Sequence, residues 1–187
     1  MAHHGGVSLS GLVAAVAKGD QGSLRQFYDQ TCGLANSLAL RILGNAEDAE
    51  EVVMDVYSKV WRSAGTFNEA RGTPLAWLLM MTRSLSIDRI RQRGSRPHTT
   101  DDVATMTFLP SAGDDPEMLT AGAERQRTVQ NAFAKLPVAQ QQVLRLAFYG
   151  GLSHSELAEQ LGQPLGTVKT RIRLGLQHLK RLLDEAN

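Results

Sequence analysis

The chain has 187 residues, a mass of 20.4 kDa and a formal net charge of +1 at pH 7, so it can hold one or two domains with real cores, while the charge alone indicates no partner. Its single cysteine, Cys32, excludes an intramolecular disulfide, and no CxxC or HxxxH spacing offers a zinc site, so we expect a core cysteine and neither metal nor cofactor. No run of eighteen apolar residues exists, and the apolar stretch at residues 7–17 lacks a cationic flank, so we expect a cytoplasmic protein without a membrane span or secretory signal.

The first half of the chain shows helical periodicity of its apolar residues and no sustained alternation typical of strands. After residues 1–6, which we expect to be a disordered tail, the pattern predicts helices over about residues 9–19, 21–43 and 46–62. Asp20 is placed to cap the second helix, and Gly44 with Asn45 to end it. The expected core positions of the second and third helices are Leu24, Phe27, Tyr28, Leu34, Leu38, Ile42, Leu43, Ala49, Val52, Val53, Val56, Val60 and Trp61.

The other side of the third predicted helix carries four carboxylates, Glu47, Asp48, Glu51 and Asp55. An exposed anionic face accounts for these charges without any specific role. A metal cluster is disfavoured, because no His or Cys joins the carboxylates.

A loop over residues 63–72 precedes a fourth helix, which Thr73 and Pro74 open because proline is tolerated at the first helical position. Residues 75–81 (LAWLLMM) are apolar nearly all round, which predicts that this half of the helix runs through the middle of a bundle. The rest of the helix is basic, although a solvated helix end favoured by the helix dipole would look the same. This stretch carries Asp88 as the one acidic residue against five arginines, Arg83, Arg89, Arg91, Arg93 and then Arg96.

Residues 94–118 have Gly, Ser, Pro, Thr and Asp in place of an apolar period, which predicts a flexible linker. The linker is acidic, because Arg96 is its only Lys or Arg against five carboxylates. We therefore expect an all-α protein of two small helical bundles, residues 7–93 and 119–187, joined by this linker.

The second bundle is predicted to contain a helix-turn-helix over residues 152–183, supported by helices over about 119–135 and 138–149 that Leu136 and Pro137 separate. Ser153 and Glu156 form a capping-box pattern at its start. Gly162 can take the left-handed conformation that ends a helix. Pro164 then falls at an early position of the next helix.

The last helix has apolar residues at spacings of three and four, which predict one buried face made of Leu165, Val168, Ile172, Leu176, Leu179 and Leu183. Hydroxyls flanked by cations fit a DNA major groove, where Arg and Thr read base edges and Lys binds phosphates. An ordinary basic surface helix is the alternative, but the capping box, the tight turn and the polar cluster together favour DNA. Lys169 and Arg171 flank the stripe, and the residues broadly opposite it are Thr167, Thr170, Arg173, Gln177 and Arg181.

Three blocks in this order resemble bacterial RNA polymerase sigma factors of the extracytoplasmic-function (ECF) group of the sigma-70 family. They are DAEEVVMDVYSKVW, PLAWLLMMTRSLSIDRIRQR and, after the acidic linker, LPVAQQQVLRLAFYGGLSHSELAEQLGQPLGTVKTRIR. The last block is also similar to LuxR-type regulators, so the alternative is a stand-alone helix-turn-helix regulator that does not bind core polymerase. That alternative leaves the acidic third helix and the basic fourth helix unexplained.

The resemblance implies a non-catalytic subunit that directs core RNA polymerase to specific promoters and assists promoter melting. Residues 7–93 would bind core polymerase and the minus-10 element, and residues 119–187 the minus-35 element. The partners it implies are the β′ clamp and β flap of core polymerase, promoter DNA and an anti-sigma factor, with no membrane insertion.

The resemblance also assigns residues. Glu47, Asp48, Glu51 and Asp55 would dock on the β′ coiled-coil clamp. The loop over residues 65–72 resembles the one that captures a base flipped from the minus-10 duplex, a task that needs stacking and hydrogen-bonding groups and cations for the strand. The minus-10 set is Phe67, Asn68, Arg83, Ser84, Arg89 and Arg91, and the minus-35 set is Thr167, Lys169, Thr170, Arg171, Arg173 and Gln177.

The sequence departs from the family pattern at four positions. Met54 stands where the family usually has Gln, and Ser84 where it often has Asn. Arg is common at the position of Leu174, and Gly175 replaces a frequent Ala at a cost of about 1 kcal/mol. No base preference is therefore carried over at Ser84 or Leu174.

Overall fold

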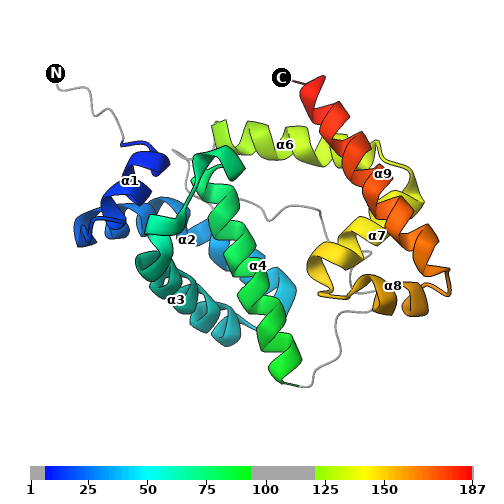
Figure 1. Ribbon diagram of the computed structural model, residues 1–187, viewed down its shortest axis with the longest axis horizontal. Coiled ribbons are helices and arrows are strands. Elements are labelled where there is room, and N and C mark those ends of the chain that lie inside the picture. Colours follow the sequence, from blue (N-terminus) through cyan, green and yellow to red (C-terminus); the bar gives the residue numbers. More distant parts are fainter. Residues whose placement is uncertain (1–6, 94–120, 187) are drawn as a thin grey trace. The chain divides into compact units, whose positions relative to one another are not determined.

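Helices form all the regular structure in the computed structural model, which describes residues 7–93 and 121–186, with only the backbone for residues 121–126. Within these ranges the chain has eight α-helices, two short 3-10 helices and no strand (Figure 1). The chain divides into two compact units, Met1–Arg89 and Ile90–Asn187. The predicted all-α class is confirmed; the expected tail over residues 1–6, the linker over 94–118 and Leu119 lie outside the described residues.

The helices of the first unit begin and end at the expected signals. Asp20 caps α2 by accepting a hydrogen bond from the backbone N–H of Gly22 at 2.9 Å, and Gly44 follows the helix with a left-handed φ of 67°. Thr73 Oγ1 accepts from the N–H of Ala76 at 3.2 Å and caps the helix that begins at Pro74, α4. The elements are α1 (Leu9–Val16), α2 (Gln21–Leu43), α3 (Ala46–Ser63), the 3-10 helices η1 (Ala64–Thr66) and η2 (Glu69–Arg71), and α4 (Pro74–Gln92).

The core of the first unit joins α1, α2, α3 and α4 through aliphatic side chains around Phe27 and Val56, both fully buried. A buried polar contact joins α2 and α3 among them: the hydroxyls of Thr31 in α2 and Tyr57 in α3 lie 2.7 Å apart. A buried hydroxyl costs free energy unless it is hydrogen-bonded, so this pair helps to set how α3 packs on α2. Burial raises the pKa of Tyr57 well above its ordinary value.

The predicted burial of three residues in this unit is wrong. Tyr28, Trp61 and Met80 are exposed, although the Tyr28 ring packs on Tyr57 with centroids 4.7 Å apart. Each directly precedes or follows a buried residue, Phe27, Val60 or Met81, and successive residues on a helix point about 100° apart. An apolar composition therefore does not bury every side of α4.

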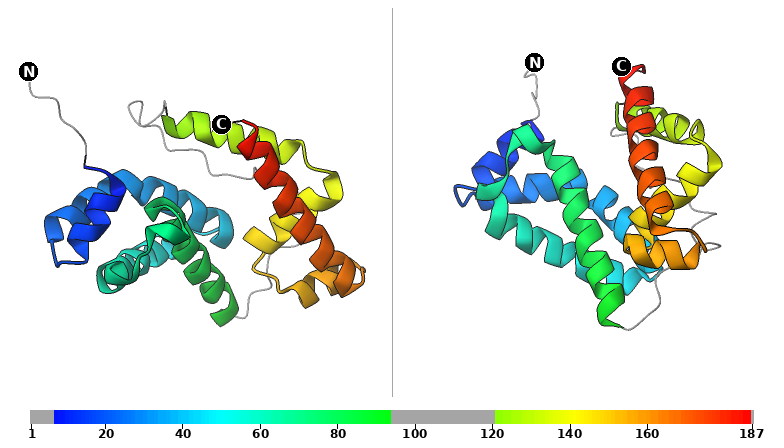
Figure 2. Two further views of the ribbon diagram at one scale, coloured as in Figure 1. Left: turned by 45° about the horizontal axis from the view of Figure 1, so that its top comes forward. Right: turned by 45° about the vertical axis from the view of Figure 1, so that its right-hand side comes forward.

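The second unit contains α6 (Ala121–Ala134), α7 (Val138–Tyr149), α8 (His154–Gln160) and α9 (Leu165–Asp184), with α9 lying against α7 and α8 (Figure 2). The predicted capping box is confirmed: Ser153 Oγ accepts from the N–H of Glu156, whose carboxylate accepts from the N–H of Ser153. These hydrogen bonds hold the pKa of Glu156 below its usual range. Gly162 has a left-handed φ of 60°, as predicted, but Pro164 occupies the N-cap position just before α9, without a side-chain cap hydrogen bond, instead of lying within the helix.

The buried face of α9 differs from the predicted one. Leu165 and Leu176 are exposed, Leu176 by 54 %, whereas Val168, Gly175 and Leu179 are buried. A Cβ built on Gly175 would lie 2.9 Å from Cδ1 of Leu144 in α7. The missing side chain thus allows α7 and α9 to approach closely, which turns Leu176 outwards.

We expect Gly175→Ala to destabilise the second unit by up to about 2 kcal/mol, because overpacking against Leu144 outweighs the roughly 1 kcal/mol gain in helix propensity. The matched control is Gly166→Ala in the same helix, where a Cβ meets nothing within 4 Å and stability should rise by up to about 1 kcal/mol. Urea unfolding followed by circular dichroism measures both changes. Equal stabilisation by the two substitutions would contradict the close approach.

Candidate functional site

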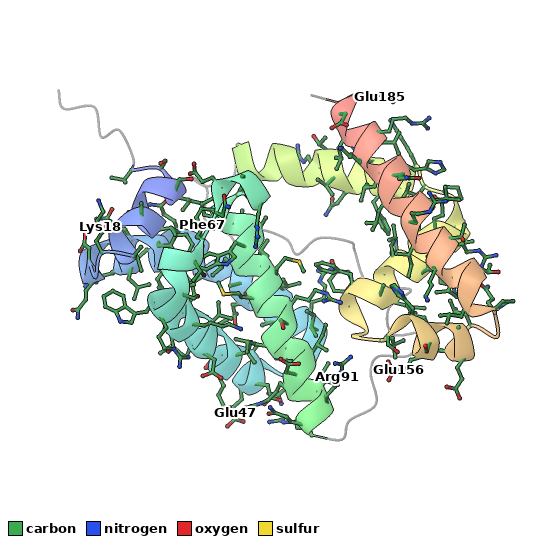
Figure 3. The ribbon with its side chains drawn as sticks, viewed as in Figure 1. Lys18, Glu47, Phe67, Arg91, Glu156 and Glu185 are labelled. Carbon is green, nitrogen blue, oxygen red and sulfur yellow. The ribbon has the colours of Figure 1, made fainter. Side chains whose placement is uncertain are left out.

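The exposed side of α3 is acidic, as predicted, but the acidic residues on it are not the same set as the predicted one. Glu47, which lies in the first turn of α3 (Figure 3), Glu51 and Asp55 are exposed, whereas Asp48 is only 3 % exposed and points into the protein. Placing Asp48 on this surface was wrong, because it falls on the same side of the helix as Val52. Glu50, which the sequence reasoning missed although it precedes Met54 by four residues, is exposed as well. We define the α3 face as the set of exposed residues Glu47, Glu50, Glu51, Met54 and Asp55.

Asp48 is buried because it has a cationic partner in α4. Arg89 donates from Nε to Asp48 Oδ1 at 3.3 Å, and its Nη2 lies 3.3 Å from the same oxygen. The same guanidinium also pairs with Glu51 on the α3 face. Arg89, expected along the melted strand, is therefore engaged by two carboxylates and ties α4 to the start of α3.

We expect Arg89→Ala to lower the free energy of unfolding of the first unit by about 3 kcal/mol, because the buried Asp48 carboxylate would lose its charged hydrogen bond to Arg89. Glu51→Ala removes only the exposed end of the same cluster and should cost less than about 1 kcal/mol. Tryptophan fluorescence during urea unfolding reports this unit, since Trp61 and Trp77 both belong to it. Similar losses in the two variants would show that the buried pair is not the stabilising part.

The rest of α4 presents an exposed row made of Met80, Ser84, Asp88 and Arg91, at spacings of four, four and three, and all but Met80 are polar. Arg91 projects from the last turn of the helix (Figure 3). Arg83 is half-buried at the edge of this row. Of the four α4 residues expected to meet DNA, Ser84 and Arg91 are thus exposed, Arg83 is half-buried and Arg89 is engaged elsewhere.

The loop expected to capture a base is folded into η1 and η2. Phe67 is half-buried, and its ring packs on Trp77 with centroids 5.3 Å apart, so it does not stand free as a stacking platform. Asn68 is exposed, and its side-chain carbonyl accepts from the N–H of Ala70 at 2.9 Å. This hydrogen bond uses the side-chain oxygen of Asn68 and not its amide N–H donors.

The exposed side of α9 carries Lys169, Thr170, Arg173 and Gln177, as expected. Lys180 continues this row at a spacing of three and was missed, although that spacing is visible in the sequence. Thr167 and Arg171 are half-buried, and Arg171 Nη1 donates to Oε1 of Gln163 in the turn. Farther along the helix, Arg181 pairs with Glu185 at 3.7 Å.

Two exposed surfaces of the described residues therefore carry opposite charge. The α3 face offers carboxylates around an exposed Met54, a combination suited to a basic protein surface and repelled by nucleic acid. The exposed side of α9 offers a hydroxyl, an amide, ammonium groups and a guanidinium, which together can contact phosphates and base edges. No described helix is long and apolar enough to span a membrane.

An all-α chain with a helix-turn-helix in one unit and an acidic helix face in the other belongs to the class of DNA-binding transcription proteins. Family models of sigma-70 region 2 and sigma-70 region 4 match residues 27–96 and 126–179. The chain is 35 % identical to the ECF RNA polymerase sigma factor SigK of Mycobacterium ulcerans and to that of Mycobacterium tuberculosis, over 178 residues that cover 94 % of this chain and 94 % of each relative. The crystal structure of Rhodobacter sphaeroides SigE in complex with the anti-sigma ChrR aligns with 92 % of this chain and 96 % of that one, at 27 % identity and a TM-score of 0.48.

The chain belongs to the sigma-70 family of RNA polymerase sigma factors, in its extracytoplasmic-function group. It is an alternative sigma factor that directs RNA polymerase to promoters, and the stand-alone regulator is excluded because region 2 precedes the helix-turn-helix. Sigma factors are transcription initiation factors and not enzymes.

Proposed function

We propose that the two ends of this sigma factor divide the work of initiation, with residues 7–93 binding core polymerase and the minus-10 element and residues 119–187 binding the minus-35 element. Residues 94–118 would connect them. The observation that carries this division is the segregation of charge between the α3 face and the exposed side of α9. We propose no catalytic step for the chain, and we propose that it acts in the cytoplasm.

The β′ clamp is the proposed partner of the α3 face. Glu47, Glu50 and Asp55 are exposed there, and Glu51 shares its charge with Arg89. Met54, 63 % exposed, adds apolar area at the centre of these carboxylates, where the family usually has an amide. Asp48 takes no part in the proposed contact, because it is buried against Arg89. The β flap and an anti-sigma factor complete the set of protein partners that we propose.

For the minus-10 element the proposal rests on the exposed row of α4 and on Asn68. Arg91 and Ser84 would follow the strand backbone, with Arg83 beside them, and the amide N–H donors of the exposed Asn68 would meet the flipped base. Phe67 would act indirectly, by anchoring the loop on α4, since its ring packs on Trp77.

The test of the proposed function is run-off transcription from a library of genomic fragments with core polymerase, with and without the chain. New start sites that depend on the chain are the expected result, and the recovered fragments supply its promoters. Initiation unchanged by adding the chain would overturn the proposal.

We expect the double variant Glu47→Lys, Asp55→Lys to bind core polymerase about tenfold more weakly or worse, because like charges brought together across an interface cost several kcal/mol. The first unit should stay folded, since exposed charges contribute little to stability. Asp29→Lys is a matched control, because Asp29 is exposed on α2 about 200° around the helix from the buried Phe27. Affinity for core at physiological salt equal to wild type would count against the α3 face.

On α9 we expect Lys169 and Arg173 to act differently. Lys169→Ala should weaken minus-35 binding across all sequences and lower the salt slope by about one, as loss of one phosphate contact does. Arg173→Ala should change the preferred sequence at one position, with a penalty of roughly 1–3 kcal/mol there. Binding-site selection and salt titration of the holoenzyme separate the two. A uniform loss with unchanged preference in both variants would contradict this division of roles.

A further inference from the structure

The turn of the helix-turn-helix is bonded to the helix that follows it by one side-chain pair. Gln163 comes directly after Gly162, and its backbone N–H donates to the carbonyl of Ala158 at 2.9 Å, which fixes the turn on α8. Its side-chain Oε1 accepts a hydrogen bond from Nη1 of Arg171, eight residues farther along the chain. Gln163 lies two residues before α9, whereas Thr167 and Arg171 are one helical turn apart within it, and all three are half-buried.

The donor and acceptor groups of this pair allow only one orientation of the Gln163 amide. A guanidinium has five N–H donors and no acceptor, so the Gln163 amide must turn its oxygen towards Arg171. A hydrogen bond to a cation is stronger than one between neutral groups. The bond to Gln163 uses one N–H of Arg171, and a guanidinium can donate further N–H groups to a second partner.

The position of Arg171 says what that partner is. Arg171 directly follows the exposed Thr170, at the border between the buried and exposed sides of α9. A cation at the edge of a recognition helix faces the sugar-phosphate backbone, whereas residues in the middle of the exposed side face base edges. An unrestrained arginine loses much rotamer freedom when it binds, and a side chain already held in place loses less.

We propose that Gln163 is a positioning residue for minus-35 binding, which holds the Arg171 guanidinium where it contacts a DNA phosphate. This inference rests on the proposed assignment of α9 to the minus-35 element. It gives the turn a part in affinity but none in sequence preference.

The experiment uses the full chain bound to core polymerase and a promoter fragment recovered by run-off transcription, with binding measured over a range of NaCl concentrations. The variants are Gln163→Ala, Gln163→Asn, Gln163→Glu, Arg171→Ala and the double variant Gln163→Ala, Arg171→Ala. The Asn variant keeps the amide but is one methylene shorter, so it should behave as the Ala variant does. Thermal unfolding of each variant shows that α8 and α9 remain folded.

We expect Gln163→Ala to weaken binding about two- to tenfold, the cost of ordering one flexible side chain, with the salt slope and the preferred sequence unchanged. Arg171→Ala should lower the salt slope by about 0.9, and adding Gln163→Ala to it should change nothing further. Gln163→Glu keeps the reach and the acceptor but neutralises Arg171, so its slope should also fall by about 0.9.

Binding by Gln163→Ala that equals or exceeds that of wild type would overturn the inference, because the pair would then be idle or would withhold Arg171 from DNA. Additive effects in the double variant would overturn it too, since Gln163 would be acting independently of Arg171. If the wild-type chain fails to support initiation on any fragment, the proposed function itself fails. If the wild-type chain supports initiation but Gln163→Ala binds as wild type does, only this inference fails.

Discussion

What α9 can offer to DNA depends on how the helix is rotated about its own axis, and that rotation is set by its close approach to α7. Gly175 leaves room for Leu144 at a distance that a Cβ would not allow. With Val168 and Leu179 buried on either side of it, the helix turns Lys169, Thr170 and Arg173 outwards. A glycine in a helix interior normally weakens the helix, so its presence here is a packing requirement with a functional consequence.

A second contact has the corresponding effect in the first unit. Arg89 binds the buried Asp48 and the exposed Glu51 at once, so the start of α3 and the end of α4 are held together by one guanidinium. The helix proposed for core polymerase and the helix proposed for the minus-10 strand are therefore mechanically coupled. The coupling is electrostatic and largely shielded from water at Asp48, where it is screened less by salt than a surface pair would be.

The net charge of +1 conceals these arrangements, because nearly equal numbers of acids and bases cancel in the sum although the α3 face is acidic and the exposed side of α9 is basic. A protein that must bind both a basic protein surface and DNA needs both signs, kept apart. The exposed carboxylates of α3 and the exposed cations of α9 meet that need, while the cation Arg89 is engaged by Asp48 and Glu51.

The sequence by itself determined the helices, their caps and the family, because these depend on signals within a few residues: Asp20 and Ser153 as caps, Gly44 and Gly162 as left-handed ends, and apolar spacings of three and four. Only the tertiary structure decided which sides of the helices are buried. Tyr28, Trp61, Met80 and Leu176 each lie one position away from a buried residue, and composition cannot resolve a rotation of about 100°, whereas Leu165 is exposed as the first residue of α9. The burial of Asp48 and its pairing with Arg89 could not be predicted from the sequence either. The two residues are 41 positions apart in the chain, and the buried charge depends on their meeting in the folded structure.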